Sequence, residues 1–98
     1  MARIELSRRA RRQLFAAHYW WRKHRDKAPE ALEEDFAEAL RQIGESPRIG
    51  KFVKHQRGGV VRRYLMERVR YYLFYRIDPT GDIEIIQLWH TSRRPPKR

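Results

Sequence analysis

The chain has 98 residues, of which 23 are Lys or Arg and 12 are Asp or Glu, giving a formal net charge of +11 at pH 7. It contains no cysteine, which excludes disulfides, thiolate nucleophiles and zinc–thiolate sites. There is no apolar run long enough to span a membrane and no apolar stretch near the start, so we expect neither a membrane segment nor a secretory signal. The length predicts one domain over residues 1–98, and the lack of cysteine favours a cytoplasmic location.

The charge is distributed in blocks along the chain. Residues 1–27 carry +7, residues 28–45 carry −5 and residues 46–76 carry +8. A basic surface of this density indicates an acidic or polyanionic partner, such as nucleic acid, a ribosome or an acidic protein. The alternative is a solvated surface in an arginine-rich proteome, without a specific partner.

The N-terminal part predicts a short strand followed by a helix. The segment "ARIELS" alternates between polar and apolar residues, and Ser7 is a residue type that caps helices. Apolar residues then recur at helical spacing and predict an amphipathic helix to about Arg25. They are Ala10, Leu14, Ala17 and Trp21. Trp20 lies off this stripe, so we expect it to be exposed, packed on a loop or an anchor for a partner.

A second helix is expected from Pro29 in its first turn to Gly44 as its stop. Its apolar stripe has the same spacing. The stripe consists of Leu32, Phe36, Leu40 and Ile43. Two helices joined by a few residues predict an antiparallel helical hairpin. Residues 45–59 are rich in glycine and charge, and they predict a loop.

The C-terminal part predicts three strands, "VVRRYLM", "RYYLFYRI" and "IEIIQLW", with "DPTGD" as a turn between the last two. Alternation places Ile83 and Ile85 on one face of the last strand and Ile86 and Leu88 on the other. Two apolar faces indicate that helices cover one side of the sheet and a partner covers the other. The order βααβββ predicts an α+β fold, with two N-terminal antiparallel helices packed on a small, mostly antiparallel sheet. A basic tail follows at residues 91–98.

His90 ends the last strand and is the candidate general acid or base. Arg93 and Arg94 follow it, and we expect Arg76 nearby on the adjacent strand, so that the set could bind a phosphate. A histidine that bonds its own turn is the alternative, because one histidine without a second acid or base is weak support for catalysis. His18 and His24, in the first predicted helix, lack partners at ligand spacing, so we expect no metal, and no cofactor motif is present.

Arginines alternate with aromatic residues in the predicted sheet. This pattern suits nucleic-acid backbones and bases, although a sheet with one wet face gives the same alternation. A plain nucleic-acid-binding module therefore stays open as a hypothesis. The arginines are Arg62, Arg63, Arg68, Arg70 and Arg76, and the aromatic residues are Tyr64, Tyr71, Tyr72 and Phe74.

The order and spacing of "ELSRRARRQL", a helical hairpin, "ESPRIGK" and "RRYL…RYYLFYRID…DIEIIQLWHTSR" resemble the ParE/RelE superfamily of type II toxins over nearly the whole chain. The resemblance implies the fold predicted above and a small basic toxin encoded beside a ParD- or RelB-like antitoxin. Antitoxins of such pairs wrap an extended or helical tail over the toxin. The partner expected first is therefore a cognate antitoxin.

The superfamily divides by target. RelE-like toxins enter the ribosomal A site and cleave messenger RNA, whereas ParE-like toxins inhibit DNA gyrase and lack nuclease activity. In RelE-like toxins a "YRLVY"-like segment supplies an arginine to the scissile phosphate, but the matching segment here is "YYLFY", with Tyr72 at that position. The ending "LWHTSR" also resembles ParE.

These features favour a ParE-like gyrase inhibitor that is not an enzyme. The alternative is a RelE-like endoribonuclease that uses His90, Arg76, Arg63 and Arg93. In either case we expect one surface to contact the target or the antitoxin. Its predicted residues are Arg62, Arg63, Tyr72, Phe74, Arg76, Trp89, His90, Arg93 and Arg94.

Overall fold

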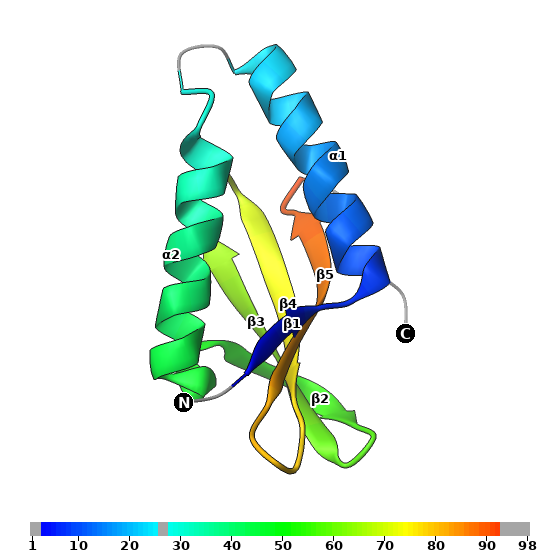
Figure 1. Ribbon diagram of the computed structural model, residues 1–98. Coiled ribbons are helices and arrows are strands. Elements are labelled where there is room, and N and C mark those ends of the chain that lie inside the picture. The colour runs from blue at the N-terminus through cyan, green and yellow to red at the C-terminus, as the bar shows by residue number, and fades with distance from the viewer. Residues whose placement is uncertain (1–2, 26–27, 93–98) are drawn as a thin grey trace.

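The computed structural model describes residues 3–25 and 28–92, which form two helices on one face of a five-stranded sheet (Figure 1). The elements are β1 (Ile4–Leu6), α1 (Arg8–His24), α2 (Ala31–Glu45), the 3₁₀ turn η1 (Pro47–Ile49), β2 (Lys51–Gln56), β3 (Gly59–Met66), β4 (Tyr71–Ile77) and β5 (Ile83–His90). The strand order is β1-β5-β4-β3-β2, with β1 parallel to β5 and the other pairs antiparallel. The predicted α+β class is confirmed. Neither described helix is both long and apolar enough to cross a membrane.

Helix α1 follows its prediction closely. The Ser7 hydroxyl accepts a hydrogen bond from the Ala10 N–H at 3.0 Å and donates one to the Ile86 carbonyl at 3.2 Å, so it caps the helix and ties it to β5. Ala10, Ala17 and Trp21 are buried against the sheet. The predicted stripe is therefore the packed face of α1, and the remaining faces point to solvent or to neighbouring elements.

Helix α2 begins and ends later than predicted. It starts at Ala31. Glu30 is the N-cap residue, and its side chain makes no capping hydrogen bond. Gly44 lies inside the helix, so its prediction as the stop is wrong. A Cβ atom at Gly44 would lie 3.4 Å from Ile4 Cδ1, an ordinary van der Waals distance, so this position faces β1.

The predicted loop at residues 45–59 is also wrong, because residues 51–56 form the edge strand β2. Arg57 and Gly58 make the two-residue turn to β3 with positive φ angles of 52° and 75°, the geometry of a type I′ hairpin. Half of the β2 side chains are exposed and most are polar, and the pairing of β2 with β3 shifts between Phe52 and Lys54. An edge strand of this kind lacks the apolar alternation by which strands are predicted.

A β-bulge changes which residues of β5 face the helices. Phe74 pairs with Gln87 while Tyr75 pairs with Ile85, so Ile86 is the extra residue. Past the bulge the alternation reverses, and Leu88 is buried in the same core as Ile85. The prediction that Ile86 and Leu88 share a second apolar face is therefore wrong.

Candidate partner-binding surface

Five of the predicted contact residues share the face of the sheet opposite the helices, named here the outer sheet face. Arg63 pairs with Phe74, and Tyr72 pairs with Trp89. Paired residues of neighbouring strands lie on the same face, and Arg76 lies two residues beyond Phe74 on β4. Their neighbours in the chain, such as Leu73 and Tyr75, face the helices instead.

The outer sheet face has an apolar centre with arginines around it. Val61 and Phe74 are buried, while Tyr72 and Trp89 are half-buried. The Arg63 guanidinium lies over the Tyr72 ring, 4.7 Å from its centroid, which is a cation–π contact. Aromatic side chains beside arginine are enriched in protein interfaces, and the positive charge favours an acidic partner.

Two polar groups of the outer sheet face are left without a hydrogen bond in the described part of the chain. The Trp89 Nε1 and the Arg76 Nε are both buried there and make no such bond. A buried N–H without an acceptor costs about 1–3 kcal/mol, so native proteins rarely leave one. This face therefore carries hydrogen-bonding capacity that folding does not use.

Arg62 lies on the other side of the sheet. It pairs with Tyr75, and its Nη1 donates to the Gly50 carbonyl at 2.8 Å. This bond fixes the start of β2. The structure thus gives Arg62 a role in holding the sheet edge and separates it from the outer sheet face.

His90 also lies on the helix side, where it lines a cavity of about 490 Å³ with Ala16, Ala17, Trp20, Arg25, Tyr71 and Ser92. Its ring meets Tyr71 edge-on at 4.9 Å. The His90 Nδ1 accepts from the Ser92 N–H at 3.1 Å and lies 2.7 Å from the Ser92 Oγ. Because Nδ1 accepts a backbone N–H, the neutral ring carries its proton on Nε2. His90 therefore bonds its own turn, as the alternative interpretation predicted.

The structure does not bring Arg76 close to His90, and that prediction is wrong. Arg76 pairs with Glu84 beside the β4–β5 turn, whereas His90 pairs with Tyr71 at the other end of the hairpin. The separation along β4 is about 16 Å at the rise of a β-strand, and the two side chains lie on opposite faces. Arg93 and Arg94, the remaining predicted partners, lie outside the described residues.

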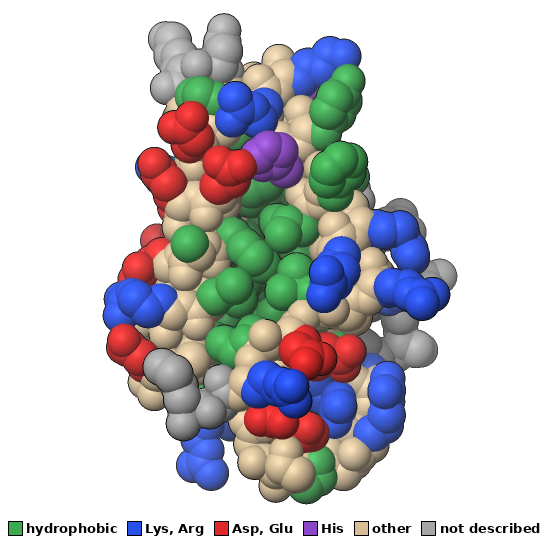
Figure 2. Space-filling view, viewed as in Figure 1, with side chains coloured by type: hydrophobic (Ala, Val, Ile, Leu, Met, Phe, Trp, Pro, Cys, Tyr) green, Lys and Arg blue, Asp and Glu red, His purple; other side chains and the backbone are tan. Residues whose placement is uncertain are grey.

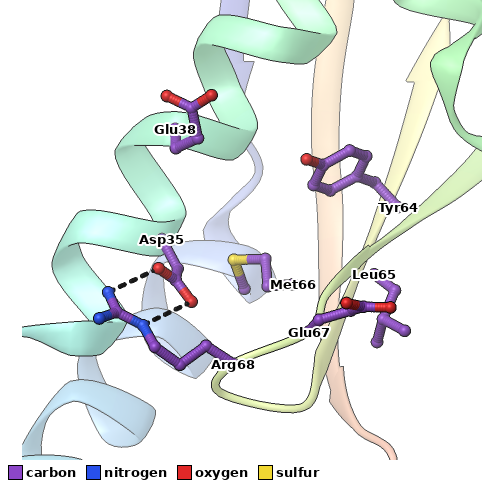
Figure 3. Close-up of a pocket in the computed structure, with 7 residues that line it drawn as sticks. All are labelled: Asp35, Glu38, Tyr64, Leu65, Met66, Glu67 and Arg68. Carbon is purple, nitrogen blue, oxygen red and sulfur yellow. Dashed lines mark hydrogen bonds and ion pairs between the residues drawn. The ribbon is translucent and has the colours of Figure 1, made fainter.

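A second cavity, of about 400 Å³, lies between α2 and the turn after β3 (Figure 3). Arg68 reaches from this turn to α2 and makes a two-bonded contact with Asp35, at 2.7 and 3.3 Å. Glu38 is held by Arg41 at 2.6 Å, and this bond lowers the pKa of Glu38 to about 2. The Arg68 contacts with Asp35 and Glu34 therefore join the turn after β3 to helix α2.

The described residues contain no group of three or more His, Asp and Glu side chains placed to hold a metal ion. His18 instead approaches Glu33 at 3.1 Å and links α1 to α2.

Phe15 and Tyr19 of α1 are 77% and 64% exposed, and neither was predicted as a site residue from the sequence. Their helical positions, opposite the apolar stripe, would have indicated this exposure.

The arrangement of the elements defines the fold class, and similar solved structures share it. The structure titled "Chromosomal ParDE TA system from P. aeruginosa" matches with a TM-score of 0.71 and 20% identity, covering 94% of this chain and 98% of that chain. The archaeal RelE-RelB complex from Pyrococcus horikoshii OT3 matches with a TM-score of 0.66 and 15% identity, covering 95% and 98%. At these identities the likeness shows the fold.

The family is shown by the sequence. The model of the family described as "ParE toxin of type II toxin-antitoxin system, parDE" matches residues 4–95. The chain therefore belongs to the ParE toxin family, as the resemblance implied. A comparison with curated proteins found no significant match.

Proposed function

We propose that this chain inhibits DNA gyrase in the cytoplasm and that a cognate antitoxin neutralises it. Membership of the ParE family supports a toxin of a type II system. The choice of gyrase over the ribosome rests mainly on the separation of Arg76 from His90. A toxin that works by binding needs contact surfaces, and it does not need an assembled acid–base site.

The endoribonuclease alternative requires a cation and an acid or base at the same phosphate. Arg76 and His90 lie on opposite faces and at opposite ends of the β4–β5 hairpin. Tyr72 occupies the position at which RelE-like toxins carry their arginine. The Nδ1 of His90 is bonded within its own turn. Together these features favour binding over cleavage.

The outer sheet face is our proposed contact surface for the target or the antitoxin. Arg63, Tyr72, Phe74, Arg76 and Trp89 combine aromatic area, positive charge and unused hydrogen-bonding groups. Arg62 and His90 are excluded from this surface because they lie on the other face.

The test compares two activities of the same purified toxin, with and without its antitoxin. One arm measures DNA supercoiling by gyrase, and the other measures messenger RNA cleavage on programmed ribosomes. We expect inhibition of supercoiling, no cleavage, and full inhibition by the His90→Ala variant. Cleavage by the wild type that is lost in both His90→Ala and Arg76→Ala, with the fold intact, would establish the endoribonuclease instead.

A further inference from the structure

The side of α1 that faces away from the sheet carries cationic and aromatic side chains that take no part in packing the helix onto the sheet. Helix α1 has cations in its first and last turns and no Asp or Glu along its length. Five of its residues project opposite the buried face of Ala10, Ala17 and Trp21. They are Arg8, Arg12, Phe15, Tyr19 and Lys23, named here the α1 stripe.

The aromatic centre of the α1 stripe is open to solvent. Phe15 is 77% and Tyr19 is 64% exposed, and at a spacing of four residues they are neighbours on the helix surface. Lys23 Nζ lies 5.5 Å from the Tyr19 ring centroid. Figure 2 shows apolar side chains projecting from the α1 side among Lys and Arg, whereas acidic side chains gather along α2. Exposed aromatic residues with charges around them are a mark of protein contact sites.

The cations of the α1 stripe make no ion pair with any described side chain, because the ion pairs found there involve other residues. The stripe therefore has charge to offer a partner. Acidic side chains on the partner would match Arg8, Arg12 and Lys23, and apolar groups would match Phe15 and Tyr19.

A second copy of this chain does not supply that chemistry. Two α1 stripes would place cations against cations. The acidic residues of α2 are already engaged, because Glu38 and Glu45 bind Arg41, and Glu34 binds Arg68. Duplex DNA fits less well than protein, because phosphates would match the cations and leave the two aromatic rings without an apolar partner.

The shape of the surface indicates which kind of protein binds it. The α1 stripe is the outer ridge of a helix, and a ridge with anchors four residues apart inserts into a groove. An antitoxin tail that wraps over the toxin needs a hollow on the toxin instead. Apolar side chains gather in a hollow between α1 and α2 (Figure 2). Leu14 of α1 and Phe36 and Leu40 of α2 are half-buried and pack against the core. The ridge therefore suits the folded target, and the hollow suits the antitoxin tail. The outer sheet face remains available as a further contact for either partner.

We propose that the α1 stripe inserts into an acidic groove with an apolar floor on gyrase, and that Phe15 and Tyr19 are its anchors. The inference rests on the proposed function and adds the surface by which the target is held. Truncating aromatic anchors at an interface centre weakens binding by about 30-fold or more. The flanking cations guide the encounter, so inhibition should weaken as salt is raised.

The experiment uses the Phe15→Ala/Tyr19→Ala double variant, with Phe52→Ala as the matched control. Phe52 is an exposed aromatic residue, 49% accessible, on β2 away from α1. Alanine on an exposed helix face leaves stability nearly unchanged. Gyrase inhibition, antitoxin affinity, duplex DNA binding and thermal unfolding are measured for each protein.

We expect the double variant to need about 30-fold more protein for half-inhibition of supercoiling, with antitoxin affinity and melting temperature unchanged. The control should match the wild type. Full inhibition by the double variant would overturn the proposal, as would an equal loss of antitoxin affinity, which would assign the stripe to the antitoxin. A third outcome would assign the stripe to nucleic acid. In that case the double variant still inhibits gyrase, the wild type binds duplex DNA, and the Arg12→Glu variant loses this DNA binding. No inhibition by the wild type would overturn the proposed function itself.

Discussion

Tyr75 is the side chain whose loss should reveal most about how the sheet is held together. It is fully buried at the centre of β4. Its hydroxyl accepts from the Gly50 N–H at 2.9 Å and donates to the Pro47 carbonyl at 2.6 Å. These two bonds join the chain between α2 and β2 to the middle of the sheet. Arg62, from β3, binds the Gly50 carbonyl beside them.

The Tyr75→Phe substitution keeps the ring and removes only the hydroxyl. The Gly50 N–H and the Pro47 carbonyl then lose their partner inside the protein. Leaving a buried polar group unpaired costs about 1–3 kcal/mol, so we expect a loss of that size in the free energy of unfolding. For a domain of this length each kcal/mol lowers the melting temperature by roughly 4–8 °C.

Urea unfolding and thermal melting are measured for the wild type, for Tyr75→Phe and for Tyr19→Phe. Tyr19 is exposed, so Tyr19→Phe serves as the control. Tyr19→Phe should stay within about 0.5 kcal/mol of the wild type. If Tyr75→Phe also stays within that range, the hydroxyl bonds do not stabilise the fold and the reasoning fails.

The pH dependence gives an independent check. Burial raises the pKa of the Tyr75 phenol above its usual value of 10.0. The unfolded chain therefore releases this proton first, and the stability from Tyr75 is complete below pH 10 and falls as the pH rises further. The stability advantage of the wild type over Tyr75→Phe should narrow above pH 10. A constant difference across that range would contradict the assigned cause.

Three further predictions concern single contacts. Ser7→Ala removes the cap of α1 and should lower the free energy of unfolding by about 1 kcal/mol, whereas Ser7→Thr should retain most of it, as measured by urea unfolding. Gln13→Met removes the side-chain carbonyl that accepts from the Leu88 N–H at 2.8 Å, and should cost about 1–3 kcal/mol and speed hydrogen exchange at that amide. Arg41→Ala should raise the pKa of Glu38 from about 2 toward the usual value of a glutamate, so that Glu38 is protonated at higher pH in the variant. Carboxyl NMR follows this titration, and an unchanged pKa would exclude Arg41 as the main cause.

Elements with strong periodicity were predictable from the sequence. The cap at Ser7 and the stripe from Ala10 to Trp21 place α1 correctly, because both signals are local. The strands β3, β4 and β5 are rich in β-branched and aromatic residues, and they form where predicted. These features sufficed for the fold class and for the family resemblance.

Features that depend on pairing between strands were not predictable. β2 forms because its backbone pairs with the edge of β3, although the side chains of β2 show little apolar alternation. The bulge at Ile86 reverses the alternation of β5, and no residue type in the segment signals it. The register of the β4–β5 hairpin separates Arg76 from His90, and a register is set by the whole sheet. The expected proximity of Arg76 to His90 was wrong for this reason.

The most direct measurement is DNA supercoiling by purified gyrase, titrated with this toxin and then with its antitoxin. The account predicts that supercoiling falls with toxin concentration, that the antitoxin restores it, and that His90→Ala inhibits as well as the wild type. A folded toxin that leaves supercoiling unchanged at all concentrations would contradict it.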